Sequence, residues 1–199
     1  MLRVMSAESN SESNIRLFNK WSFDEVEIAD LGLQRYISLR PVIIPHSGGR
    51  FQDQRFKKSE MNIVERFVNK LMKKGRNAGK KQRIINIVKT AFEIIHLRTN
   101  KNPIQVLVDA IIYSAPREET TRITWGGVAQ HSSVDIAPQR RVDLALRYLA
   151  EAIKQKSFNN IKSVDEIVAE ELILASNNDL NSAAVKKKAE VERIALSAR

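Results

Sequence analysis

Two apolar segments with helical spacing flank the stretch Lys73-Lys74-Gly75-Arg76-Asn77-Ala78-Gly79-Lys80-Lys81-Gln82-Arg83, called the basic hinge below. Before the hinge, apolar residues recur at Ile63, Val64, Phe67, Val68, Leu71 and Met72, and after it at Ile84, Ile87, Val88, Ala91, Phe92 and Ile95. Glycine readily adopts positive φ angles, so one helix can end near Gly75 and the next can begin near Gly79. The sequence therefore predicts two helices, at residues 60–74 and 80–98, joined by a short polar connection.

The basic hinge contains six Lys or Arg residues and no acidic residue. The whole chain of 199 residues has a formal net charge of +10, and residues 45–90 hold 13 Lys or Arg against 3 Asp or Glu. The positive excess is therefore concentrated in one part of the chain. Because like charges repel, presenting them on a rigid turn favours a polyanionic partner. The alternative is a solubilising charged face, although such faces usually mix both signs.

The composition excludes several classes of protein. The chain has no cysteine, which excludes disulfides, cysteine-based zinc sites and thiol catalysis. No apolar run approaches the roughly 20 residues that a membrane-spanning helix needs. Residues 1–5 are too few for the core of a signal peptide. We therefore expect a soluble, intracellular protein without a membrane partner.

Motifs for catalysis or metal binding are missing from the sequence. Residues 75–81 invite comparison with a phosphate-binding loop, but the glycines are one residue too close, no Ser or Thr follows the lysine, and a helix rather than a strand is predicted before them. His46, His96 and His131 lie far apart and without an accompanying carboxylate pattern. The prediction is a protein without enzymatic activity, cofactor or metal.

Residues 1–59 are predicted to form a disordered start followed by an extended arm. Residues 6–14 are polar and lack an apolar anchor, whereas the next 25 residues mix aromatic and acidic side chains without one clear period. In that mixed stretch, Trp21 and Phe23 suit a core position and a docking position equally. Farther along, cations on an irregular segment surround an aromatic residue: Arg50, Arg55, Phe56, Lys57 and Lys58. This pattern suits backbone contacts and base stacking on RNA, and its alternative is a solvated linker.

Residues 60–199 are predicted to form a helical domain. Asn102 is a suitable N-cap with Pro103 at the first helical position, and the nearly continuous apolar run that follows predicts a buried central helix ending near Ser114. Further helices are predicted at residues 138–156, at 163–176 after a capping box, and at 182–199. The last of these is basic through Lys186, Lys187 and Lys188. This basic helix could be a solvated chain end or could bind phosphate.

Residues 119–137 differ from the rest of this domain and predict one β-hairpin. Strand-prone residues flank Gly126-Gly127, a pair that suits a tight hairpin turn. Because an isolated two-stranded hairpin is marginal in water, it either reaches out to a partner or lies flat on the body. The predicted fold class is therefore mainly α, with one β-hairpin and an N-terminal extension.

Several stretches form an ordered set: Ile63-Val64-Glu65-Arg66, the hinge at 73–81, residues 89–97, 102–111 and 116–119, Val134-Asp135-Ile136 with Pro138, Arg140 and Arg141, and residues 186–193. Together they resemble the universal small-ribosomal-subunit protein family numbered seven in bacteria and five in eukaryotes. The similarity covers about residue 15 to the end of the chain. The arm resembles the eukaryotic branch at Leu17, Phe18, Lys20 and Trp21.

The resemblance implies a helical bundle with one protruding β-hairpin, bound to the 3′ major domain of small-subunit rRNA. It implies a role in organising the head of the subunit, beside neighbouring ribosomal proteins, with the hairpin and C-terminal region near exit-site tRNA and the mRNA path. The implied location is cytoplasmic, in the small ribosomal subunit, with assembly in the nucleolus if the source is eukaryotic.

The resemblance also implies which residues meet RNA. Those expected to bind rRNA are Arg50, Arg55, Lys57, Lys58, Lys73, Lys74, Arg76, Asn77, Lys80, Lys81, Arg83, Arg117, Arg122, Arg140, Arg141, Lys186, Lys187 and Lys188. Those expected near tRNA and mRNA are Trp125, Gly126, Gly127, Gln130, His131 and Arg199. One departure concerns the hairpin tip, where eukaryotic members usually carry arginines, because residues 125–131 contain no Lys or Arg. The expectation of rRNA binding does not depend on this tip.

Two other classes of protein compete with this interpretation. A free DNA-binding regulator is the main alternative, because helix–turn–helix units also join helices at glycine-containing turns. Against it, the positive charge lies in the connection itself rather than along a recognition helix. An enzyme acting on nucleic acid would need a carboxylate or metal cluster, and the sequence shows no pattern for one.

Overall fold

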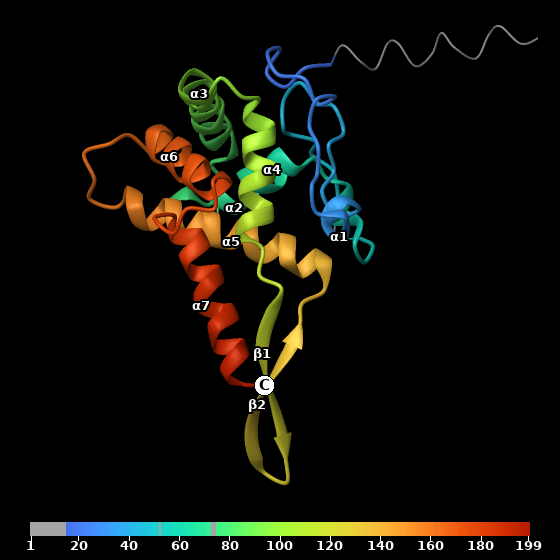
Figure 1. Ribbon diagram of the computed structural model, residues 1–199. Coiled ribbons are helices and arrows are strands. Elements are labelled where there is room, and N and C mark those ends of the chain that lie inside the picture. Colours follow the sequence, from blue (N-terminus) through green and yellow to red (C-terminus); the bar gives the residue numbers. More distant parts are fainter. Residues whose placement is uncertain (1–14, 52, 73–74) are drawn as a thin grey trace, which may run out of the picture.

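The computed structural model describes residues 15–51, 53–72 and 75–199 (Figure 1). The described α-helices are α1 (Leu31–Gln34), α2 (Ile63–Leu71), α3 (Lys81–Thr99), α4 (Pro103–Ser114), α5 (Pro138–Ser157), α6 (Val164–Ser176) and α7 (Ala183–Ser197). The other described elements are the short 3-10 helices η2 (Lys57–Glu60) and η3 (Gly75–Asn77) and the strands β1 (Glu118–Trp125) and β2 (Val128–Asp135). The predicted fold class, mainly α with one β-hairpin, is confirmed.

Helix α4 lies at the centre of the helical body, in contact with α3, α5, α6 and α7. Its start follows from local chemistry, because Asn102 Oδ1 accepts a hydrogen bond from Ile104 N at 3.1 Å and Pro103 occupies the first turn. Apolar residues lie on every side of this helix, and most of them are buried by its four neighbours. The predicted buried central helix is confirmed.

Helix α2 is shorter than the 60–74 predicted from the apolar spacing. The helix begins after its N-cap, Asn62, whose Oδ1 accepts a hydrogen bond from Val64 N at 2.9 Å. The residues before the cap belong to the separate short helix η2. The helix ends at Leu71 and is followed by the hinge. Gly75 and Gly79 have φ angles of +65° and +75°, as two sharp changes of chain direction require. Helices α2 and α3 pack against each other, so the predicted helix pair is confirmed.

The N-terminal arm packs on the helical body and adds to its core. Trp21 is 7% exposed, and its ring meets Phe92 of α3 edge-on with the ring centroids 5.9 Å apart. Phe23 is buried as well, and the backbone of Glu27 is tied to the Gln105 side chain of α4 by hydrogen bonds of 2.8 and 3.0 Å. Of the two positions that the sequence left open, both aromatic residues take the core position, and their large apolar surfaces stabilise the arm on the body.

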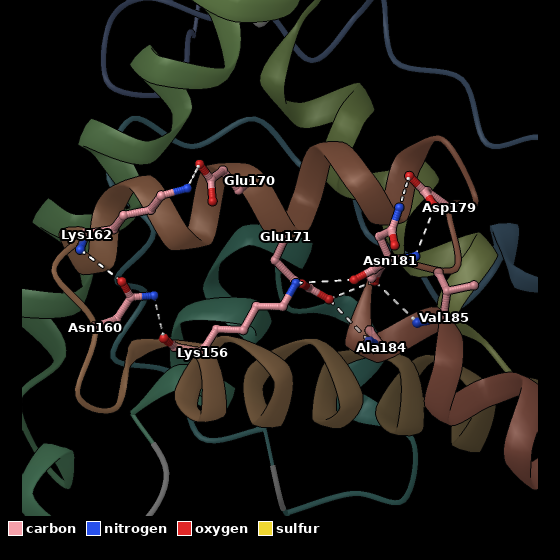
Figure 2. Close-up of polar contacts among 10 residues, drawn as sticks. Lys156, Asn160, Lys162, Glu170, Glu171, Asp179, Asn181, Ala184 and Val185 are labelled. Atoms are coloured by element: carbon pink, nitrogen blue, oxygen red, sulfur yellow. Dashed lines mark hydrogen bonds and ion pairs between the residues drawn. The ribbon is translucent and has the colours of Figure 1, made fainter.

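A buried carboxylate joins the last three helices (Figure 2). Glu171 of α6 is fully buried and accepts hydrogen bonds from Ser182 Oγ at 2.7 Å and from Ala184 N at 3.2 Å, both at the start of α7. Lys156 of α5 pairs with the same carboxylate. The first turn of a helix favours a nearby negative charge, so Glu171 fixes where α7 begins and which way it points.

The hairpin projects away from the helical body beside α7 (Figure 1), so it does not lie flat on the body. Its turn residues Gly126 and Gly127 both have positive φ, as a tight hairpin turn requires. The base is braced by the end of the chain, because Ser133 N donates to Ala198 O at 3.3 Å. The predicted hairpin is confirmed, with strands that span residues 118–135 rather than 119–137.

Candidate nucleic-acid interface

A groove of about 1040 Å³ lies between the hinge and the C-terminal half of α5. Its charged rim is mostly cationic, with Lys80 and Arg83 on the hinge side, Arg147 and Lys154 on α5, and the acidic Glu151 of α5 beside them. Apolar residues also line it: the buried or half-buried Leu71, Ile84, Ile87, Ile153 and Val168, and the exposed Phe158 and Val164. The fold thus brings two positively charged segments, far apart in the sequence, to one surface.

The hinge residues differ in how they face solvent. Lys80 and Arg83 are exposed, and neither forms an ion pair with any residue that the structure describes. Lys81 is only 18% exposed, and its Nζ donates to Glu65 Oε1 of α2 at 2.6 Å. Asn77 is exposed in η3. Three predicted contacts lie outside the described residues: Lys73, Lys74 and the side chain of Arg76.

Glu65 connects Lys81 to the arm. The buried Glu65 carboxylate also accepts hydrogen bonds from Ser47 N and Ser47 Oγ, each at 3.1 Å. Burial raises the pKa of Glu65, but the hydrogen bonds from Lys81 and Ser47 together lower it below its ordinary value. Lys81 therefore holds α3, α2 and the arm together, and most of its charge is compensated within the protein.

The basic segment of the arm, residues 50–58, is anchored to the body at its end. Lys58 pairs with Asp143 of α5, and Arg66 Nη2 of α2 donates to the same carboxylate at 3.1 Å. Burial raises the pKa of Asp143, but the Lys58 hydrogen bond and the Arg66 charge lower it overall. The remaining cations of the segment face solvent wholly or in part: Arg50, Arg55 and Lys57.

At the base of the hairpin, two of the predicted arginines have acidic partners within the protein. Arg140 of α5 forms a bidentate pair with Glu119 of β1, with N–O distances of 2.6 and 2.8 Å. Arg141 Nη2 donates to Asp30 Oδ2 at 3.0 Å, and its side chain is 13% exposed. These pairs position α5 against β1 and the arm. The other two predicted arginines, Arg117 and Arg122, are exposed.

The C-terminal cations also divide into paired and unpaired ones. Lys187 forms an ion pair with Glu190 at 2.8 Å, whereas Lys186 is exposed and Lys188 is partly buried. Arg199 pairs with Glu118 and so lies at the hairpin base rather than at its tip. The tip exposes Gly126, Gly127, Gln130 and His131, and the Trp125 side chain is outside the described part of the chain.

Two cations of the groove rim, Arg147 and Lys154, are absent from the set predicted from sequence. They follow Arg140 at steps of seven residues, so the three lie along one face of α5, and all three are exposed. The spacing is visible in the sequence. Only the fold shows that this face of α5 borders the hinge, so the sequence alone did not place these cations at the groove.

No group of three or more His, Asp or Glu residues in the described part of the chain could hold a metal ion. None of the described helices combines the length and hydrophobicity needed to cross a bilayer. A helical body with a cationic groove, a basic arm and a projecting hairpin is typical of the class of proteins that bind nucleic acid by shape and charge.

Comparison with known proteins narrows this class. The family described as ribosomal protein S7p/S5e matches residues 33–199. Small ribosomal subunit protein uS7 of Cenarchaeum symbiosum is 52% identical over 194 residues, which cover 94% of this chain and 98% of the relative. The proteins of the same name from Methanothermobacter thermautotrophicus and Methanosphaera stadtmanae are each 49% identical, over 92% and 93% of this chain and 98% and 99% of their own lengths.

The chain therefore belongs to the ribosomal protein S7p/S5e family, as its sequence patterns predicted. The family is a structural rather than an enzymatic component of the ribosome, which confirms that the chain is not an enzyme. The three relatives are archaeal, so the eukaryotic character of the arm stays a prediction.

Proposed function

We propose that this protein is a structural component of the small ribosomal subunit that acts by binding small-subunit rRNA. The main support is the extent of the similarity: relatives that are small ribosomal subunit proteins match nearly the whole chain at 49–52% identity. The cationic groove supplies the physical means, because neutralising RNA phosphates releases counterions and favours binding.

The proposed contacts fall into two groups. One group faces solvent wholly or in part and forms no ion pair with a described residue. These cations would bind phosphate directly: Arg50, Arg55, Lys57, Lys80, Arg83, Arg117, Arg122, Arg147, Lys154, Lys186 and Lys188. Cations already paired with acids would mainly keep this surface in shape: Lys58, Lys81, Arg140, Arg141 and Lys187. Lys73, Lys74, Arg76 and Asn77 belong to the same hinge and are proposed as further phosphate contacts. RNA helices are recognised mainly by shape and backbone, which such a rigid surface suits.

The finer placement in the subunit is part of the proposal. We infer binding to the 3′ major domain of the rRNA in the head, beside other ribosomal proteins, with residues 60–199 as the main RNA-binding domain and residues 50–58 of the arm as a further contact. The projecting hairpin supports a position from which its tip approaches exit-site tRNA and mRNA. The proposed location is the cytoplasmic ribosome, preceded by assembly in the nucleolus in a eukaryotic source.

Sedimentation of the endogenous protein in a ribosome gradient, followed by a high-salt wash, tests the proposal. We expect the protein to sediment with the small subunit and to remain there after the wash. Its presence only in light fractions would contradict a ribosomal role.

A competition experiment separates the main alternative. The purified protein is offered small-subunit rRNA and duplex DNA of equal length and concentration, at one salt concentration. Preference for the rRNA is expected, since the exposed cations come from the arm, the hinge and α5 together rather than from one recognition helix alone. Preference for the duplex would favour a DNA-binding regulator.

A further inference from the structure

Phe56 has an unusual backbone conformation for an aromatic residue. Its φ angle is +71°, in the left-handed region that bulky side chains rarely adopt, yet its side chain is 53% exposed. The conformation is held by its carbonyl, which accepts hydrogen bonds from Ser59 N at 2.9 Å and from Ser59 Oγ at 2.7 Å. The chain thus adopts an unfavourable φ without burying the ring, which points to a use for the ring outside the free protein.

The surroundings of the ring are cationic. The Arg55 guanidinium lies over the Phe56 ring, 5.0 Å from its centroid, and Lys57 follows directly. Arg50 is exposed in the same segment. A guanidinium beside an aromatic ring is a surface on which flat, electron-rich groups stack, and the flanking charges attract phosphate.

The segment is firmly attached to the body. η2 begins at the residue after Phe56, and its Lys58 is tied to Asp143, a carboxylate that Arg66 also binds. Both Asp143 and Arg66 belong to long-range contacts between α5 and α2. Because the attachment lies only two residues from Phe56, the exposed ring is presented in a defined place.

We propose that Arg55 and Phe56 form a stacking site for an unpaired base of the bound RNA, with Arg50 and Lys57 on the adjacent phosphates. The proposal rests on the proposed function. An unpaired nucleotide fits better than an apolar protein segment, because such a segment would leave the surrounding cations without partners. The sequence pattern of this segment suited base stacking in general; the structure assigns the stacking to the Phe56 ring, which is not among the residues expected to bind rRNA.

Three substitutions of Phe56 test the site, with binding to transcribed small-subunit rRNA measured over a range of salt concentrations. Phe56→Tyr keeps the ring and should keep the affinity. Phe56→Leu keeps apolar bulk without a stacking face, and Phe56→Asn accepts the positive φ but removes the ring. Each of the last two should weaken binding about 5- to 150-fold, the range measured for one stacked base. The salt dependence should not change, since no phosphate contact is lost.

Thermal unfolding of the free variants separates binding from folding. Phe56→Asn should unfold at the same temperature as the parent protein or higher, because asparagine tolerates the left-handed conformation. Equal affinity of Phe56→Leu and the parent would overturn the proposal, as would weaker binding by all three variants in proportion to their lost stability. If the parent protein itself shows no salt-dependent binding to the rRNA, the proposed function fails together with the stacking site.

Discussion

At the residue scale, two neighbouring lysines of the hinge have different roles. Lys80 is exposed at the start of α3, whereas Lys81 is turned inward and paired with the buried Glu65. Removing the partner of a buried charge leaves that charge uncompensated, which is far more costly than removing a solvated one. Lys80 therefore adds positive charge to the surface, whereas Lys81 stabilises the fold by neutralising Glu65.

The matched variants Lys80→Met and Lys81→Met test this difference. Lys81→Met should lower the free energy of unfolding by about 3–5 kcal/mol, and Lys80→Met by less than about 0.5 kcal/mol. Lys80→Met should instead reduce the slope of log affinity for rRNA against log salt by about 0.7–0.9. Denaturant unfolding and salt-dependent binding measure the two effects. Equal loss of stability in both variants would contradict the assignment.

A second adjacent pair, Glu170 and Glu171 of α6, allows a similar comparison (Figure 2). Glu171 is fully buried among its three partners, whereas Glu170 pairs at the surface with Lys162 at 2.7 Å. Glu171→Ala should destabilise the protein by about 1–3 kcal/mol for each buried donor that loses its acceptor, Ser182 Oγ and Ala184 N at the start of α7. Glu170→Ala should cost less than about 1 kcal/mol. Urea unfolding of both variants measures the difference, and similar losses would show that Glu171 is not needed to hold α7.

At the scale of elements, the hairpin has a braced base and a free outer half. The base is held by the Arg140–Glu119 pair from α5 and by contacts with the end of α7. The outer half projects from the body (Figure 1). An isolated hairpin is only marginally stable, so the bracing explains how this one persists in the free protein. RNA binding and contact with tRNA are therefore expected to be separable.

Shortening the hairpin tests that separation. Residues 123–130 can be replaced by Asn-Gly, which closes a tight turn on the Arg122–His131 pair and leaves the braced base unchanged. We expect normal affinity for small-subunit rRNA, with weaker retention of deacylated tRNA at the exit site of reconstituted subunits. Binding assays and tRNA retention give the two readings. Loss of rRNA binding would show that the tip contributes to assembly.

At the scale of the whole molecule, two buried or half-buried carboxylates link the arm, α2, α3 and α5. Burial raises the pKa values of Glu65 and Asp143, but they lie below their ordinary values of 4.5 and 3.8 because Lys81 and Ser47 lower the first, and Lys58 and Arg66 the second, by more. A carboxyl that binds its proton less readily when folded stabilises the protein above its unfolded pKa. That stability is lost as the pH falls through the folded pKa.

Thermal unfolding of the free protein between pH 7 and pH 3 should therefore show a progressive loss of stability below about pH 4.5. The Glu65→Gln variant should lose less on acidification, since its contribution is already absent. Burial raises the pKa of Asp109, so this residue acts in the opposite direction, and Asp109→Asn should make the acid loss steeper. An unfolding temperature that does not change over this range would contradict the role given to Glu65 and Asp143.

Periodicity, capping residues and glycine positions determined the helices, the central place of α4 and the hairpin, because each depends on residues close together in the chain. The ordered family stretches also came from the sequence alone, and the comparisons confirmed the family. For the candidate site, the sequence located the positively charged segments but not which of their side chains face solvent. Only the tertiary structure decided that Lys81 faces inward while Lys80 faces solvent, and that Arg147 and Lys154 border the hinge. The orientation of these side chains depends on partners that are distant in sequence, such as Glu65 for Lys81. The residues next to each lysine in the hinge do not show whether its side chain will be buried or exposed.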